Sequence, residues 1–388
     1  MGPAAQALAV RRGVMHLLAD PGTAGEAWGA AARCSLEAWR LFLRVEDCAL
    51  PLRARLGAAE PLAAGVRREV ERTAGEEVGR VLAARAELAA LGRTARALGV
   101  QAVLLKGGVA AAQGELLDLL DVDLLLSPGD ARAFAAALDR AGYAAAGADA
   151  AGPEFGVHHL AERRAPNSLP IEIHFDLKGV DGVDAFRARA VPLDAAPGLA
   201  RPAADDQLWH LLVHATHHHP ARRARIRDLL LIGRAAAECA PEERARVDAR
   251  VRAHPAARDL AAVLAAAQAL RGSGPPLDPH RRMAAAIYLF LPLSERLRLP
   301  PLVQKEMFES LAALSGGPED RRLYRRAVTR RTATPSELPG LAGLERRLPA
   351  LLSPLRVAIR AGRHAVWLAA AAPLALRARA LAARADGP

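Results

Sequence analysis

Two aspartates stand one residue apart inside an apolar run. Asp121 and Asp123 flank Val122, and leucines occupy 119–120 and 124–126. Because residues i and i+2 of a strand face the same way, a strand here would bring both carboxylates to one side. Two like charges so close repel each other unless a cation neutralises them, and carboxylates suit hard ions such as Mg²⁺ or Mn²⁺. The pattern favours a metal site over two solvated acids on an edge strand.

A second alternating segment, at 169–176, supplies further acids. Its apolar residues alternate with Glu172, His174 and Asp176, so these three polar side chains are expected on one face of a strand. If this strand lies beside the first, Glu172 joins Asp121 and Asp123 as a third carboxylate, and His174 and Asp176 on the same face are its rivals. Same-face residues are roughly 6–7 Å apart along a strand, so we expect only one of Glu172 and Asp176 to bind the metal. The alternation itself does not choose between them.

A glycine turn follows the strand expected at 99–105. Lys106, Gly107 and Gly108 stand where a helix begins, and glycines there let backbone amides approach a phosphate. The chain has three lysines among 53 basic residues of the Lys and Arg types. A lysine at this position therefore suggests a compact positive charge near phosphate. The alternative is a solvated lysine at a structural turn.

The surrounding elements divide the chain into three predicted parts. Residues 1–95 form a helical N-terminal region, 96–200 an α/β core, and 201–388 a helical C-terminal region. Besides the strands at 99–105, 119–126 and 169–176, we expect a strand around 156–160 and a helix at 131–141 capped by Asp130. The predicted fold class is α/β (α+β), with a small mixed sheet flanked by mainly α-helical regions.

The order of these blocks resembles a known superfamily. The blocks are Leu-Leu-Lys-Gly-Gly at 104–108, Asp-Val-Asp at 121–123 followed by three leucines, Ala-Gly-Tyr at 141–143 and Ile-Glu-Ile-His-Phe at 171–175. Together they look like a nucleotidyltransferase of the DNA polymerase β superfamily, and in particular its uncharacterised nucleotidyltransferase family, over about residues 75–235. The resemblance implies a nucleotidyltransferase core, an NTP such as ATP as substrate, and Mg²⁺ (or Mn²⁺) as cofactor.

The resemblance also implies roles for single residues. The catalytic and metal-binding carboxylates are Asp121, Asp123 and Glu172. The nucleotide-binding turn consists of Lys106, Gly107 and Gly108. The implied reaction is transfer of a nucleoside monophosphate to a hydroxyl or phosphate by a two-metal mechanism. The acceptor, a small molecule, a peptide or RNA, is not indicated.

A second hypothesis belongs to a different class of protein. The family usually carries an arginine a few residues before the first aspartate, where this chain has leucines on both sides of Asp118. This departure favours a catalytically silent accessory protein that binds a nucleotide or a partner, as in a biosynthetic cluster or a toxin–antitoxin system. Intact Asp121, Asp123 and Glu172 favour the enzyme.

The composition restricts partners and location. With 52% hydrophobic and 24% charged residues in 388, the chain is globular rather than disordered. Its net charge of +11 is consistent with polyanion contact through basic helices, or with a merely soluble surface. Cys34, Cys48 and Cys239 fit free thiols in the cytoplasm. The apolar stretches at 283–293 and 365–376 fall short of the roughly 20 residues that span a bilayer, so we expect a cytoplasmic protein without stable transmembrane insertion.

Histidines gather at 210–219 on an expected helix end. His210 and His214 are four residues apart, a spacing that transition-metal ligands use. No carboxylate lies between them as in a zinc protease, and apolar residues line the opposite helix face. We favour a polar, partly buried helix face over substrate contact or zinc binding.

Overall fold

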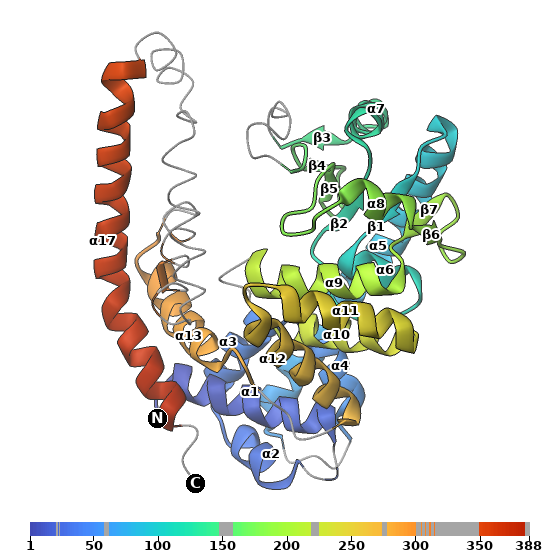
Figure 1. Cartoon of the computed structure of the whole chain (residues 1–388). Coiled ribbons are helices and arrows are strands. Elements are labelled where there is room, and N and C mark those ends of the chain that lie inside the picture. Colours follow the sequence, from blue (N-terminus) through green and yellow to red (C-terminus); the bar gives the residue numbers. More distant parts are fainter. Residues whose placement is uncertain are drawn as a thin grey trace. The chain divides into compact units, whose positions relative to one another are not determined.

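The computed structural model groups the chain into two compact units (Figure 1). The larger comprises Ala9–His218 and Ala224–Pro279, and the smaller Met1–Leu8, His219–Arg223 and His280–Pro388. The three predicted parts, with boundaries at 95/96 and 200/201, stay a prediction. The structure describes residues 1–20, 22, 24–57, 62–146, 158–218, 225–273, 278–299, 304, 307, 310–311, 314 and 349–384.

Within these residues, seven strands of the larger unit form one mixed sheet in the order β3-β4-β5-β2-β1-β7-β6. The strands are β1 (Ala102–Leu104), β2 (Val122–Leu125), β3 (Ala144–Ala145), β4 (Arg163–Arg164), β5 (Ile171–His174), β6 (Val191–Pro192) and β7 (Leu199–Arg201). The three main predicted strands are present but shorter than expected. The predicted fold class, a small mixed sheet with helical flanks, is confirmed.

The pairing of β2 decides which side chains meet. β2 runs antiparallel to β1, with Leu104 opposite Leu124. It runs parallel to β5, with Asp123 opposite Glu172. All four residues of β2 are buried, as are all three of β1, which explains why both strands read as apolar runs rather than as alternating ones. The predicted neighbourhood of the two acidic strands is confirmed.

Helices account for most of the remaining described chain. α1 (Pro3–Ala19) precedes α2 and α3, and Trp39 of α3 packs edge-on against Trp28 of α2 and Phe42 of α3 at ring-centroid distances of 6.0 and 5.8 Å. α5 packs against α4, α6 and α7, while α10 packs against α9 and α12. The bounds are α2 (Gly25–Ala32), α3 (Leu36–Glu46), α4 (Ala49–Arg55), α5 (Ala64–Leu98), α6 (Lys106–Ala112), α7 (Pro128–Arg140), α8 (Val183–Ala188), α9 (Ala204–Val213), α10 (Ile226–Glu238), α11 (Pro241–Ala253) and α12 (Ala257–Gln268).

The helix predicted at 131–141 begins earlier than expected. Ser127 is the N-cap of α7, and its hydroxyl oxygen accepts a hydrogen bond from the backbone N–H of Asp130 at 3.1 Å. Pro128 follows in the first helical position, where its fixed φ favours the helix and its missing N–H costs nothing. The assignment of the cap to Asp130 is therefore wrong. Gly142, at φ +92°, follows the helix.

Two further sequence predictions have outcomes in this unit. Residues 147–157 lie outside the described chain, and of the strand expected around 156–160 the structure describes an isolated bridge between His159 and His174. Cys34, Cys48 and Cys239 are free thiols, as predicted.

The smaller unit holds α13 (Arg281–Arg296) and α17 (Pro349–Arg384), which pack against each other. The segment Ala365–Ala383 of α17 is, by length and composition alone, long and apolar enough to cross a membrane. The expectation that the apolar stretch at 365–376 is too short is wrong, because the helix continues past Leu376 with mostly apolar residues. The cytoplasmic location and the absence of stable transmembrane insertion stay predictions.

Candidate active site

Asp123 is the buried centre of the predicted site, with its side chain 2% exposed. Its Oδ1 accepts a hydrogen bond from Lys106 Nζ at 2.7 Å and lies 2.8 Å from His174 Nε2. The same imidazole nitrogen lies 3.4 Å from Glu172 Oε2. His174 Nε2 therefore bridges Asp123 of β2 and Glu172 of its own strand, β5. Ligand atoms of Asp123, Glu172 and His174 all lie within 4.8 Å of one another.

Asp121 lies just before β2 rather than within it. Burial raises its pKa to about 6, and the charge of Asp123 adds to the rise, whereas Lys106 acts in the opposite direction. The two aspartates thus act on each other electrostatically, although strand periodicity alone does not align them. Asp121 resists ionisation chiefly because burial disfavours its charged form, and the negative charge of Asp123 adds to this effect.

Lys106 faces the carboxylates instead of the solvent. Its φ of +48° is left-handed, which is uncommon outside glycine, and its side chain is 16% exposed. Burial opposes its charged form, but Asp123, Asp121 and Glu172 outweigh burial and raise the pKa of the ammonium. A fully solvated lysine, the alternative weighed from the sequence, does not describe this position.

The charges of the other site residues depend on one another. Burial alone would raise the pKa of Asp123, but Lys106 and His174 hold it well below the usual value. The hydrogen bond from His174 lowers the pKa of Glu172. Burial disfavours protonated His174, yet its bonds to Asp123 and Glu172 prevail and raise its pKa. Both carboxylates are therefore held in their ionised form.

The two glycines after Lys106 allow close packing. A β-carbon on Gly108 would lie 2.6 Å from Leu104 Cδ1, and one on Gly107 would lie 3.3 Å from Leu119 Cβ. The turn therefore lies directly against β1 and against the segment that leads to Asp121. This packing accounts for a glycine at position 108 even when no ligand is considered. The roles of Gly107 and Gly108 in nucleotide binding therefore stay predictions.

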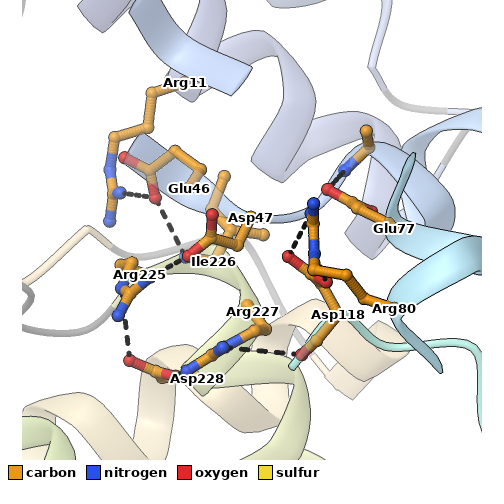
Figure 2. A network of polar contacts seen from close by, with 11 residues as sticks. Arg11, Glu46, Asp47, Glu77, Arg80, Asp118, Arg225, Ile226, Arg227 and Asp228 are labelled. Carbon is orange, nitrogen blue, oxygen red and sulfur yellow. Dashed lines mark hydrogen bonds and ion pairs between the residues drawn. The ribbon is translucent and has the colours of Figure 1, made fainter. Parts of the chain in front are cut away.

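The segment before β2 is held by a network of polar contacts around Asp118 (Figure 2). Asp118 is fully buried, and its two carboxylate oxygens accept hydrogen bonds from Arg80 Nε and Nη2 at 2.7 and 2.8 Å. Arg227 Nη1 donates to the backbone oxygen of Asp118 at 3.5 Å. Helices α5 and α10 thereby fix the chain three residues before Asp121. Sequence reasoning missed these contacts, which join residues 38 and 109 positions apart.

Further polar contacts anchor the start of α10. Glu46 Oε2 accepts from the backbone N–H of Ile226 at 3.0 Å and also pairs with Arg11, while Asp47 pairs with Arg225. An acidic group at a helix N-terminus is favourable because it satisfies N–H groups that lack helical partners. These contacts fix the turn of α10 that carries Arg227.

His210 is the histidine of α9. It is buried, and its ring lies edge-on to Phe186 at 6.1 Å and to His214 at 6.0 Å. Burial lowers the pKa of His210 to about 3, and the charges of Lys106, Asp123 and His174 also act on it. The His210 imidazole is therefore buried and uncharged at neutral pH. The side chains of His217–His219 lie outside the described residues.

The donor set fits a divalent cation. The ligand atoms that lie together are those of Asp123, Glu172 and His174, while Asp121 is outside this group and is coupled to Asp123 by charge. The three carboxylates Asp121, Asp123 and Glu172 outnumber one ammonium and one imidazole, which leaves negative charge even when His174 is protonated. The Glu172 side chain is 27% exposed, against 2% for Asp123. His174, named from the sequence only as a rival to Glu172 on the same strand face, belongs to this group. Asp176, the other rival, is absent from the described candidate ligand group.

The mixed sheet sets an Asp-x-Asp segment beside an acidic strand, with a glycine turn after the adjoining strand, and this sheet with its helical flanks is consistent with a nucleotidyltransferase core. The family model of uncharacterised nucleotidyltransferases matches residues 44–272, more than half of the chain. The chain belongs to this family. No curated protein and no solved structure matches it.

Proposed function

We propose that the protein transfers a nucleoside monophosphate from an NTP to a hydroxyl or phosphate of an acceptor. Membership of the family supports nucleotidyl transfer in general. The observation that carries the proposal is the parallel register in which Asp123 lies opposite Glu172, with Asp121 at the entrance of the same strand. This register brings together acids that are about fifty residues apart in the chain.

Asp121, Asp123 and Glu172 are the residues that would hold Mg²⁺ or Mn²⁺. When bound, such ions activate the acceptor oxygen and neutralise the pyrophosphate leaving group. Lys106 stabilises ionised Asp123 at 2.7 Å, so that this carboxylate can serve as a ligand at neutral pH. His174 does the same for Glu172.

The proposed chemistry forms one bond and breaks one. The acceptor oxygen bonds to the α-phosphorus, while the bond from that phosphorus to the oxygen bridging to the β-phosphate breaks and pyrophosphate leaves. Glu172 is the residue that would accept the acceptor's proton, because it is ionised and more exposed than Asp123.

The test is pyrophosphate release from each of ATP, GTP, CTP and UTP with Mg²⁺ or Mn²⁺, in the presence of candidate acceptors. Asp123→Asn and Glu172→Gln keep the shape of the side chain but remove its charge, and each should reduce turnover by about a hundredfold or more. Asp176→Asn is the matched control, since it changes an acid two positions beyond His174. Unchanged turnover in both site variants would contradict the proposal.

One observation favours the silent accessory protein as a second candidate. The oxygen of Asp123 that accepts from Lys106 is also bonded to His174, so the buried carboxylate is satisfied without a metal. A protein that binds nucleotide with measurable affinity but releases no pyrophosphate from any of the four NTPs would support this candidate.

A further inference from the structure

Arg227, on the first turn of α10, approaches the glycine turn from across the segment that leads to β2. Its Nη1 donates to the backbone oxygen of Asp118 at 3.5 Å (Figure 2). A β-carbon on Gly107 would lie 3.9 Å from that same oxygen. A single backbone carbonyl therefore lies between the guanidinium and the turn predicted to bind the nucleotide. Arg227 comes from a helix that begins more than a hundred residues later in the chain.

The carboxylate that Arg227 contacts is shared with another arginine. Nε and Nη2 of Arg227 both donate to Asp228 Oδ1, at 3.1 and 3.0 Å, and Arg225 Nε lies 3.9 Å from Asp228 Oδ2. By contrast, Arg80 engages both oxygens of Asp118. Arg227 thus pairs with one oxygen of Asp228, and its Nη1 forms a long hydrogen bond to the uncharged backbone carbonyl of Asp118. The side chain is 13% exposed, so the surrounding protein does not enclose it completely.

The charge of Arg227 acts on the acidic site. Burial and Asp123 raise the pKa of Asp121, whereas Lys106 and, more weakly, Arg227 act in the opposite direction. Two cations from different elements, one from the start of α6 and one from α10, therefore act on the same aspartate. The sequence has no arginine just before Asp121, but the fold brings one close to it from α10.

We propose that Arg227 binds the phosphates of the nucleotide that leave as pyrophosphate, together with Lys106. The planar guanidinium presents a fork of N–H donors that matches phosphate oxygens. The inference rests on the proposed function for the identity of the ligand, an NTP. It adds a phosphate-binding residue outside the motifs that suggested the nucleotidyltransferase.

The test measures binding rather than turnover, so that it is separate from the test of the proposed function. Titration calorimetry with Mg²⁺ compares inorganic tripolyphosphate, ATP and AMP on the full chain. A charged hydrogen bond contributes about 1.5–3 kcal/mol, and 1.4 kcal/mol corresponds to a factor of ten. Arg227→Gln should therefore weaken tripolyphosphate and ATP about tenfold to a hundredfold, with AMP within about twofold.

The matched control is Arg234→Gln. Arg234 lies two turns later on α10, is 15% exposed, and forms comparable ion pairs with Glu115 and Glu238 at 3.1 and 2.9 Å. This variant should bind all three probes like the wild type. Arg227→Lys keeps the charge but loses the fork, and should give an intermediate affinity. It also provides the comparison if Arg227→Gln does not fold.

The outcomes separate the two proposals. Tripolyphosphate affinity that is unchanged in Arg227→Gln, or equal loss in Arg227→Gln and Arg234→Gln, overturns the role of Arg227. A wild type that binds neither ATP nor tripolyphosphate overturns it as well. If the wild type binds both and Arg227→Gln does not, but no NTP is ever turned over, the role of Arg227 stands and the enzymatic proposal fails.

Discussion

Replacing Lys106 with methionine tests how the buried acid is held. The change removes the ammonium that lies 2.7 Å from Asp123 Oδ1 and keeps a side chain of similar length. Removing one partner of a buried ion pair costs about 3–5 kcal/mol. Asp123 keeps its contact with His174, and Lys106 is partly exposed. We therefore expect a smaller loss, about 2–3 kcal/mol, in the free energy of unfolding.

The assay is thermal unfolding with EDTA at neutral pH, following the transition of the unit that holds the site. For a unit of this size 1 kcal/mol corresponds to about 2–4 °C, so Lys106→Met should lower Tm by roughly 4–12 °C. Lys178→Met, which changes an exposed lysine, is the control. Saturating Mg²⁺ should stabilise Lys106→Met more than the wild type, because the site then holds one more uncompensated negative charge.

The pH dependence has a defined sign. The pKa of Asp123 is depressed in the folded protein, so its contribution to stability is present above its unfolded pKa and is lost as pH falls through the folded value. Without Lys106 this pKa rises, and the loss on acidification begins at higher pH. Adding Asp123→Asn should recover much of the stability lost in Lys106→Met. If Lys106→Met unfolds like the wild type in EDTA, or if the double variant is less stable than the single one, the reasoning is wrong.

Three further predictions concern the same unit. Because burial, reinforced by Asp123, raises the pKa of Asp121 to about 6, Mg²⁺ affinity measured by calorimetry should increase from pH 5 to pH 7, and Asp121→Asn should remove this dependence. Burial lowers the pKa of His210 from 6.5 to about 3, so on acidification the unfolded state binds a proton that the folded state does not. Between pH 7 and pH 5, the free energy of unfolding measured in urea should therefore fall by about 2 kcal/mol less for His210→Phe than for the wild type. Equal losses in the two proteins would contradict this account. Gly108→Ala would place a carbon 2.6 Å from a methyl of Leu104 and should lower the free energy of unfolding by about 1–3 kcal/mol. Gly75→Ala, where the added carbon has nothing within 4 Å, should raise it by up to about 1 kcal/mol. Chemical denaturation that finds changes of the same sign for both variants would refute the packing argument.

Local patterns in the sequence determine the elements that carry the acids. The apolar runs before Lys106 and around Asp123 predict β1 and β2, and the alternation around Glu172 predicts β5. These predictions are possible because the burial of a strand determines the hydrophobicity of residues that are neighbours in the sequence. The preference of helices for an aspartate at the N-cap misplaced the cap of α7, since Pro128 begins the helix and Ser127 is its cap. The motif order also identifies the family, which the family model confirms.

Only the tertiary structure decides which distant residues meet. Alternation puts Glu172, His174 and Asp176 on one face, but the parallel register with β2 sets Glu172 opposite Asp123 and brings His174 to the same carboxylate. Arg227 reaches Asp118 from 109 positions along the chain. No local period encodes such a contact, because it results from the packing of whole helices against the sheet. The sequence thus determines which acids the strands carry, and the packing determines which cations hold them.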